Sequence, residues 1–96
     1  MDILVAYDVC TETTQGERRL RKVAQICLDF GQRVQKSVFE CAVSDMQYEK
    51  LKGRLLACMD PREDNLRIYR LATPKEQFLE CFGLRRDIDF QGPLIV

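Results

Sequence analysis

Two amphipathic helical patterns interrupt a series of short β-rich runs in this chain, and few folds accommodate that order. Residues 2–8 read as a strand with apolar side chains at consecutive positions from Ile3 to Tyr7, as expected of a strand that is covered on both faces of a sheet. The first helical pattern then places an apolar stripe along one side of a helix: Leu20, Val23, Ala24, Cys27 and Leu28. Residues 32–43 are β-rich, a second helix runs to Asp60-Pro61, and residues 66–71 form a last strand.

Local signals mark the ends of both helices. Thr14-Gln15-Gly16-Glu17 and Ser44-Asp45-Met46-Gln47 each match a capping box, in which two side chains satisfy free N–H groups of the first turn. Gly31 follows the first helix where glycine commonly ends one. The second helix carries these apolar residues on one side: Tyr48, Leu51, Leu55 and Met59.

The β-rich segment between the two helices changes its phase of alternation. Val34 and Val38 share one phase, and Phe39, Cys41 and Val43 share the other. Such a slip predicts a bulge or a sharp bend near Ser37-Val38. The segment is therefore either two short strands or one strongly broken strand.

These elements together predict an α+β, ferredoxin-like βαββαβ domain over residues 1–72, with two helices on one face of an antiparallel four-stranded sheet. No helix is left for the other face. A chain of 96 residues buries only a thin core, so a second copy is the simplest cover. Residues 73–96 form a C-terminal extension with conflicting signals, because Thr73-Pro74-Lys75-Glu76 is typical of a helix start while Phe78–Phe82 could equally be an edge strand.

Composition excludes several chemistries. The chain has no histidine, which removes the usual general base and any Ser-His or Cys-His nucleophile. Its five cysteines form no C-x-x-C pair, so we expect reduced thiols that act as small core residues. No apolar run approaches the roughly 20 residues of a membrane span, and the N-terminus lacks the features of a signal peptide. A cytoplasmic protein with no membrane contact is expected.

Asp8 is the acidic residue at the carboxyl end of the first strand. An unpaired carboxylate at that place is costly, so we expect a metal, a backbone N–H group or a cation as its partner. Capping or loop hydrogen bonding is the commoner role. If a two-fold axis passed nearby, two Asp8 carboxylates could hold one octahedral magnesium ion, with water and substrate phosphate completing its shell.

The net charge is zero, but the cations are unevenly distributed. Between Gly16 and Lys36, only Glu17 and Asp29 oppose a cluster of basic residues: Arg18, Arg19, Arg21, Lys22, Arg33 and Lys36. A solvated helix face is the ordinary explanation of such a cluster. Because few acids adjoin it, we expect a basic face that binds a phosphate backbone without sequence preference and with steep salt dependence.

Four segments resemble the small CRISPR adaptation protein family, the ferredoxin-like partner of the spacer integrase, often described as a CRISPR-associated endoribonuclease. They are Ile3–Val9, Arg18–Ala24, Gly31–Cys41 and Asn65–Leu71. The resemblance covers about residues 2–71, and the run Arg-Val-Gln-Lys-Ser-Val-Phe-Glu from Arg33 is its most specific part.

The resemblance implies a homodimer whose Asp8 side chains flank the two-fold axis and share one magnesium ion, which makes Asp8 the candidate catalytic and metal residue. It implies a functional face that includes Tyr7, Ser37 and Phe39. The candidate nucleic-acid-binding residues are Arg18, Arg19, Arg21, Lys22 and Arg33. It further implies that Phe78–Phe82 is a fifth strand and that the final residues cross to the partner subunit or the integrase.

Three functional hypotheses follow. The first is a scaffold in CRISPR spacer acquisition that joins the integrase to double-stranded DNA. The second is a magnesium-dependent endonuclease that cleaves RNA or double-stranded DNA with paired Asp8. The third is a ferredoxin-like ligand sensor, for which the sequence has no pocket-forming motif.

Overall fold

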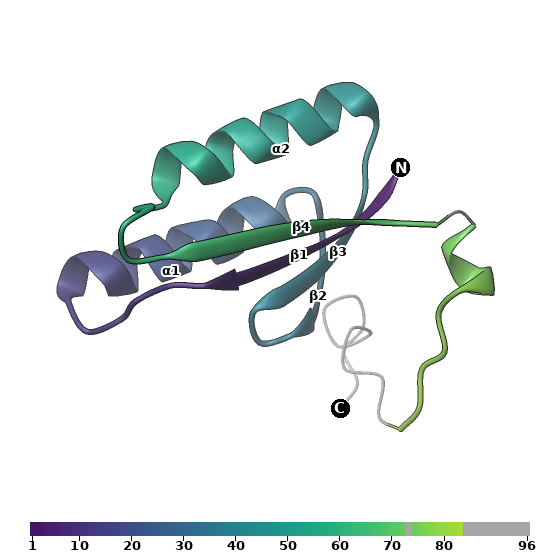
Figure 1. Cartoon of the computed structure of the whole chain (residues 1–96), viewed down its shortest axis with the longest axis horizontal. Helices are drawn as coiled ribbons and strands as arrows, with labels where there is room; N and C mark the ends of the chain where they lie inside the picture. The colour runs from purple at the N-terminus through teal and green to yellow at the C-terminus, as the bar shows by residue number, and fades with distance from the viewer. Residues whose placement is uncertain (73, 84–96) are drawn as a thin grey trace.

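The computed structural model describes residues 1–72 and 74–83 and confirms the α+β ferredoxin-like arrangement. Its elements are β1 (Asp2–Asp8), α1 (Thr14–Leu28), β2 (Gly31–Gln35), β3 (Val38–Ala42), α2 (Asp45–Cys58), β4 (Asn65–Leu71) and the 3₁₀ helix η1 (Lys75–Gln77). The four strands form one antiparallel sheet in the order β2-β3-β1-β4, with α1 and α2 on one side of it (Figure 1). Within the described ranges, no helix has the length and apolar character that a membrane span requires.

The core lies between the sheet and the two helices. Alternate residues of β1 face the helices: Ile3 and Val5 are fully buried and Tyr7 nearly so. Phe39 of β3 pairs in register with Val5, and Cys41 pairs with Ile3, so these buried side chains adjoin across the strands. The helices contribute Val23, Ile26, Cys27, Tyr48, Leu51 and Leu55.

Both helices begin at side-chain caps. Ser44 forms the predicted capping box, since its hydroxyl accepts a hydrogen bond from the Gln47 N–H while the Gln47 side chain accepts one from the Ser44 N–H. The cap of α1 lies one residue before the predicted one. The Thr13 hydroxyl, and not that of Thr14, accepts from the Gly16 N–H at 3.0 Å.

The prediction that Gly31 ends α1 is wrong. The helix ends at Leu28, Asp29 is its C-cap with right-handed backbone angles, and Gly31 is the first residue of β2. A Cβ at Gly31 would lie 2.1 Å from the Glu40 carbonyl oxygen and 2.6 Å from the Cys41 sulfur. Glycine is therefore required by the close approach of β2 to β3, and not by a helix cap.

The phase change between the helices corresponds to a hairpin of two strands. β2 pairs with β3, with a register shift between Arg33 and Gln35, and the hairpin turns at residues 36–37. The Ser37 carbonyl accepts a hydrogen bond from the Tyr7 N–H at 3.1 Å. The hairpin turn is thereby fixed beside the end of β1.

The expected fifth strand is not formed within the described chain. Residues 78–83 have no strand conformation, and the Thr73-Pro74-Lys75-Glu76 signal corresponds to η1. A strand needs a neighbour for its ladder hydrogen bonds, and the described segment leaves the sheet instead of pairing with it (Figure 1). Phe78 and Phe82 are consequently 66% and 85% exposed. The residues expected to cross to a partner, after Gly83, lie outside the described residues.

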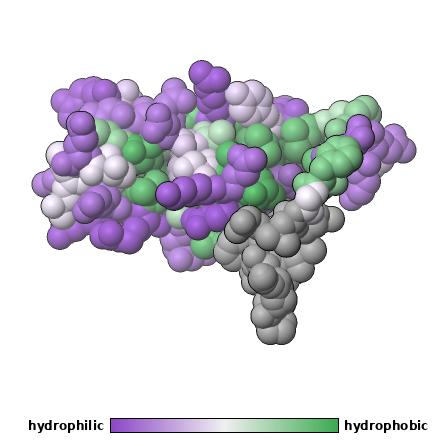
Figure 2. Space-filling model, turned by 90° about the horizontal axis from the view of Figure 1, so that it is seen from below, coloured by the Kyte–Doolittle hydropathy of each residue, from purple (hydrophilic) through white to green (hydrophobic). Residues whose placement is uncertain are grey.

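The second face of the sheet has no helix over it in the described structure. Leu4 and Ala6 of β1 alternate with the buried residues and so point to this face. The register places Leu4 between Tyr69 of β4 and Glu40 of β3, and Ala6 between Val38 of β3 and Arg67 of β4, so this face carries both apolar and charged side chains. Figure 2, seen from the side away from α2, shows hydrophobic residues gathered between hydrophilic margins.

Candidate functional site

The carboxyl end of β1 meets several other segments at one end of the sheet. Asp8, its last residue, is exposed and pairs in register with Asn65, the first residue of β4. On the other side, the hydrogen bond from the Tyr7 N–H to Ser37 brings in the β2–β3 turn. The first turns of α1 lie at the same end of the molecule (Figure 1). Asp8 and the cationic start of α1 therefore share one end of the fold.

Asp8 supplies one carboxylate per chain at this end of the sheet. Across the residues that the structure describes, no three or more His, Cys, Asp or Glu side chains are grouped so as to hold a metal ion. Magnesium requires only one or two protein carboxylates when water and phosphate complete its octahedral shell. Two copies of the chain with Asp8 facing Asp8 would bring two carboxylates together for such an ion.

A buried carboxylate holds the loop that follows Asp8. The Asp64 side chain is fully buried and accepts hydrogen bonds from the N–H groups of Cys10 (3.1 Å) and Asp60 (2.9 Å). It also accepts from Arg19, at 2.8 Å from Nε and 3.2 Å from Nη2. The hydrogen bonds from Arg19 lower the pKa of the Asp64 carboxyl, against the opposing effect of burial. Asp64 thus joins the exit of β1, α1 and the turn before β4.

Arg19 has acidic partners, contrary to the expectation that the cations of this helix lack them. Besides Asp64, its guanidinium lies 3.8 Å from the Glu63 carboxylate, and its side chain is only 16% exposed. Sequence reasoning missed Asp64 because its partners lie 45 and 54 positions away in the chain. The only signal was the acidic group at residues 60–64. Arg19 is engaged within the fold, and its role at a nucleic-acid surface stays a prediction.

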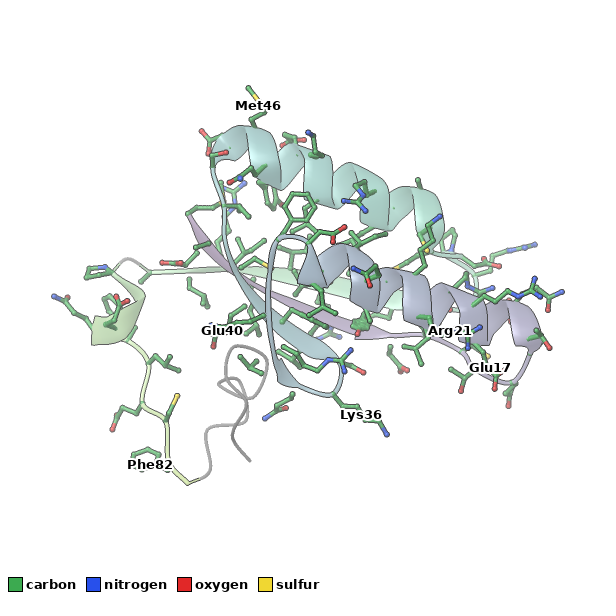
Figure 3. The ribbon with its side chains drawn as sticks, turned by 180° about the vertical axis from the view of Figure 1, so that it is seen from behind. Glu17, Arg21, Lys36, Glu40, Met46 and Phe82 are labelled. Atoms are coloured by element: carbon green, nitrogen blue, oxygen red, sulfur yellow. The ribbon has the colours of Figure 1, made fainter. Side chains whose placement is uncertain are left out.

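The other predicted cations of α1 lie at the surface. Arg18, Arg21 and Lys22 are exposed, and none of them takes part in an ion pair within the described part of the chain. They line one side of a shallow groove between α1 and α2. Figure 3, seen from behind, shows Arg21 on α1 in front of the sheet. The structure thus gathers these cations on the helix layer.

Arg33 lies on the edge strand β2, apart from the cations of α1. Its guanidinium is 5.1 Å from the centre of the Phe39 ring, which stacks against Tyr7 at 6.1 Å. The Arg33 Nε is buried without a hydrogen-bond partner among the described residues. Burial raises the pKa of the Tyr7 hydroxyl, and the nearby Arg33 opposes that rise. Tyr7 and Phe39 are therefore core residues beneath Arg33, while Ser37 lies half-buried in the turn.

The two buried cysteines are poor nucleophiles. Burial raises the pKa of the Cys27 thiol to about 12 and that of the Cys41 thiol to about 11. A thiol reacts as its thiolate, which is scarce at neutral pH when the pKa is so high. Cys27 and Cys41 act as small core residues, as predicted, and all the cysteines are free.

Comparison with known proteins agrees with this fold. The family model for the CRISPR associated protein Cas2 matches residues 1–78. A Moorella thermoacetica protein named CRISPR-associated endoribonuclease Cas2 1 is 57% identical over 96 residues, which is all of both chains. A Halalkalibacterium halodurans protein named CRISPR-associated endonuclease Cas2 is 46% identical over 95 residues, or 99% of each chain.

A solved structure gives the same result. The crystal structure of Streptococcus pyogenes Cas2 aligns with a TM-score of 0.77 and 46% identity, covering 86% of this chain and all of that one. The fold and the matches together define a small ferredoxin-like CRISPR-associated protein. The chain belongs to the Cas2 family.

Proposed function

We propose that this chain acts in CRISPR adaptation as a homodimeric scaffold that holds double-stranded DNA and joins it to the spacer integrase. The observation that carries the proposal is the set of exposed cations on α1, Arg18, Arg21 and Lys22, which have no ion-pair partner within the described residues. Such cations bind backbone phosphates by charge and release counterions, so the binding is independent of sequence and sensitive to salt.

The face of the sheet opposite the helices, called the open face below, supports the proposed dimer. Leu4, Ala6, Val38 and Tyr69 lie on a surface that no helix of the described chain covers. A second copy would remove this surface from water and enlarge a small core. Phe78 and Phe82 of the C-terminal extension are exposed apolar side chains that would gain from burial against the partner subunit or the integrase.

The salt dependence of duplex binding tests the scaffold. Arg18→Gln, Arg21→Gln and Lys22→Gln should each lower the magnitude of the slope of log affinity against log salt by about one. Lys52→Gln is the matched control, because it removes the same charge. Lys52 lies on α2, away from the cations of α1, and pairs with Glu49. Unchanged duplex binding in all three α1 variants would contradict the proposal.

A second candidate is a magnesium-dependent endonuclease, which the exposure of Asp8 at the end of β1 favours. The two Asp8 carboxylates of a dimer would hold the ion, which supplies a polarised phosphate and an activated water when bound. Two relatives are named as an endoribonuclease and an endonuclease, which also supports this candidate. The chain offers no histidine base, and the described residues contain no group of three or more His, Cys, Asp or Glu side chains that could hold a metal ion, so we favour the scaffold.

A nuclease assay separates the two candidates. Purified dimer is incubated with RNA or duplex DNA, with and without magnesium, beside Asp8→Ala and Asp8→Asn. An enzyme would lose magnesium-dependent cleavage in both variants while its dimer stays intact. A scaffold shows no cleavage that depends on Asp8.

A further inference from the structure

The groove on the helix layer involves both helices. Its lining residues are Arg18, Arg21, Lys22, Gln25 and Ile26 of α1 and Arg54 of α2. The lining contains cations from both sides and no acid. The positive surface is therefore a cleft between two helices, which the sequence-based expectation of a basic α1 did not include.

The Asp29 carboxylate, at the end of α1, binds Arg54 of this groove. The Arg54 Nη2 donates a hydrogen bond to Oδ2 of Asp29 at 3.0 Å. The Gln25 Nε2 donates to Oδ1 of the same carboxylate at 3.2 Å. The guanidinium also lies 5.7 Å from the centre of the Phe30 ring, which limits its range of positions. Two donors of the groove, Gln25 and Arg54, thus bind the same Asp29 carboxylate.

Another anion can replace Asp29 as the partner of Arg54. Their side chains are 43% and 41% exposed, so water screens the pair and its net contribution is small. A guanidinium binds phosphate oxygens with the same planar geometry as carboxylate oxygens. A neutral amide donor such as Gln25 serves either anion equally well.

We propose that Arg54 and Gln25 form a binding site for a backbone phosphate of double-stranded DNA, which Asp29 occupies in the free protein and leaves on binding. The inference rests on the proposed function and extends the DNA surface from α1 onto α2. Asp29 acts as a built-in competitor, so the affinity of the groove is lower than its cations alone would give. Duplex DNA is the occupant that we favour, because it presents successive phosphates and the lining of the groove carries four cations and no acid.

Duplex-binding titrations of the full-length chain at several salt concentrations test the site. Arg54→Gln should weaken binding about 3- to 10-fold and lower the magnitude of the salt slope by about one. Asp29→Asn, which keeps the side-chain shape and removes the competing charge, should strengthen binding about 3-fold. In the Arg54→Gln background, the same Asp29 change should have an effect of less than about 1.5-fold.

The exposed pair Lys52 and Glu49 on α2 supplies matched controls. Lys52→Gln and Glu49→Gln remove the same charges outside the groove and should leave duplex affinity near that of the unaltered chain. Equal strengthening by Asp29→Asn and Glu49→Gln would show an effect of net charge only and would overturn the site.

Three further outcomes would contradict the inference, and they differ in what they imply for the proposed function. If Arg54→Gln binds normally while Arg18→Gln and Arg21→Gln bind weakly, the inference fails and the proposed function stands. If all three bind normally, both fail. If Arg54→Gln loses binding to polyglutamate but not to the duplex, the groove takes an acidic protein segment, which also overturns the inference.

Discussion

Asp64 accepts hydrogen bonds from the loop after β1, from α1 and from the turn before β4, and its side chain is fully buried. Asp64→Asn replaces one acceptor oxygen with an amide NH₂ group, which donates hydrogen bonds and accepts none. At least one buried N–H group therefore loses its partner. We expect a loss of about 2–3 kcal/mol in the free energy of unfolding, measured by chemical denaturation. Glu63→Gln is the control, because the Glu63 side chain is 45% exposed and contacts Arg19 at the longer distance of 3.8 Å. Equal losses in the two variants would contradict the role of Asp64.

The same carboxyl predicts a pH dependence of stability. Its pKa is lowered in the folded state, chiefly by the hydrogen bonds from Arg19, so the folded protein binds the proton less readily than the unfolded chain. The resulting stabilisation is fully present above the unfolded pKa of about 3.9 and is lost as the pH falls through the folded pKa. The difference in denaturation midpoint between the unaltered chain and Asp64→Asn should therefore shrink below about pH 4. A constant difference through that range would disprove the assignment.

At the scale of helices and strands, the order of elements could be predicted because each pattern is local. The Ser44 capping box and the phase change near Val38 each involve neighbouring residues, and the structure contains both features. Gly31 was misassigned because glycine meets two needs, a helix cap and a close approach between strands. Asp64 could not be linked to Arg19, since the pair forms only when the chain has folded.

The C-terminal extension shows that a whole element can also depend on contacts that the local sequence does not reveal. Phe78–Phe82 has the composition of a strand, but strand formation depends on a neighbouring edge and not on composition alone. In the described chain that segment has no pairing strand, and the local proline-led signal forms η1 instead. The position of Asp8 at the end of β1 could be predicted from the sequence and is confirmed, whereas its pairing with a second Asp8 stays a prediction.

Two glycines provide a matched test of helix packing. A Cβ at Gly16, in the first turn of α1, would lie 1.8 Å from the Cys10 carbonyl oxygen, while a Cβ at Gly53 of α2 would meet nothing within 4 Å. Gly16→Ala should destabilise the fold by about 2 kcal/mol or more, because backbone must move to admit the methyl group. Gly53→Ala should stabilise it by about 0.5–1 kcal/mol through helix propensity. Thermal melts of both variants check the signs, and a stabilised Gly16→Ala would refute the close approach.

At the scale of the whole molecule, the open face of the sheet predicts self-association. Light scattering of the chain at micromolar concentration should give about twice its mass of 11.2 kDa. Tyr69→Glu places a charge on the open face, where Tyr69 is 45% exposed, and should shift the protein to monomer. Leu56→Glu is the control on the outer side of α2, where Leu56 is 62% exposed, and should leave the mass unchanged. A monomeric parent chain would contradict the dimer.

The whole-molecule arrangement separates two surfaces. The sheet has one face that no helix of the described chain covers, which the proposed dimer would bury, and the helix layer carries the groove of cations that is proposed to bind DNA. Asp8 lies at the end of β1, outside that groove lining, so phosphate binding by the cations does not require it. A scaffold can therefore keep its function when Asp8 is lost, whereas a nuclease cannot.

Spacer acquisition in cells that carry the integrase and a repeat array tests this distinction most directly. A scaffold predicts near-normal acquisition with Asp8→Ala and a decrease of at least about 10-fold when Arg18, Arg21 and Lys22 are all changed to Gln, because each removes a phosphate contact. The contrary result is loss of acquisition with Asp8→Ala, together with loss of magnesium-dependent cleavage, while the triple Gln variant acquires spacers normally.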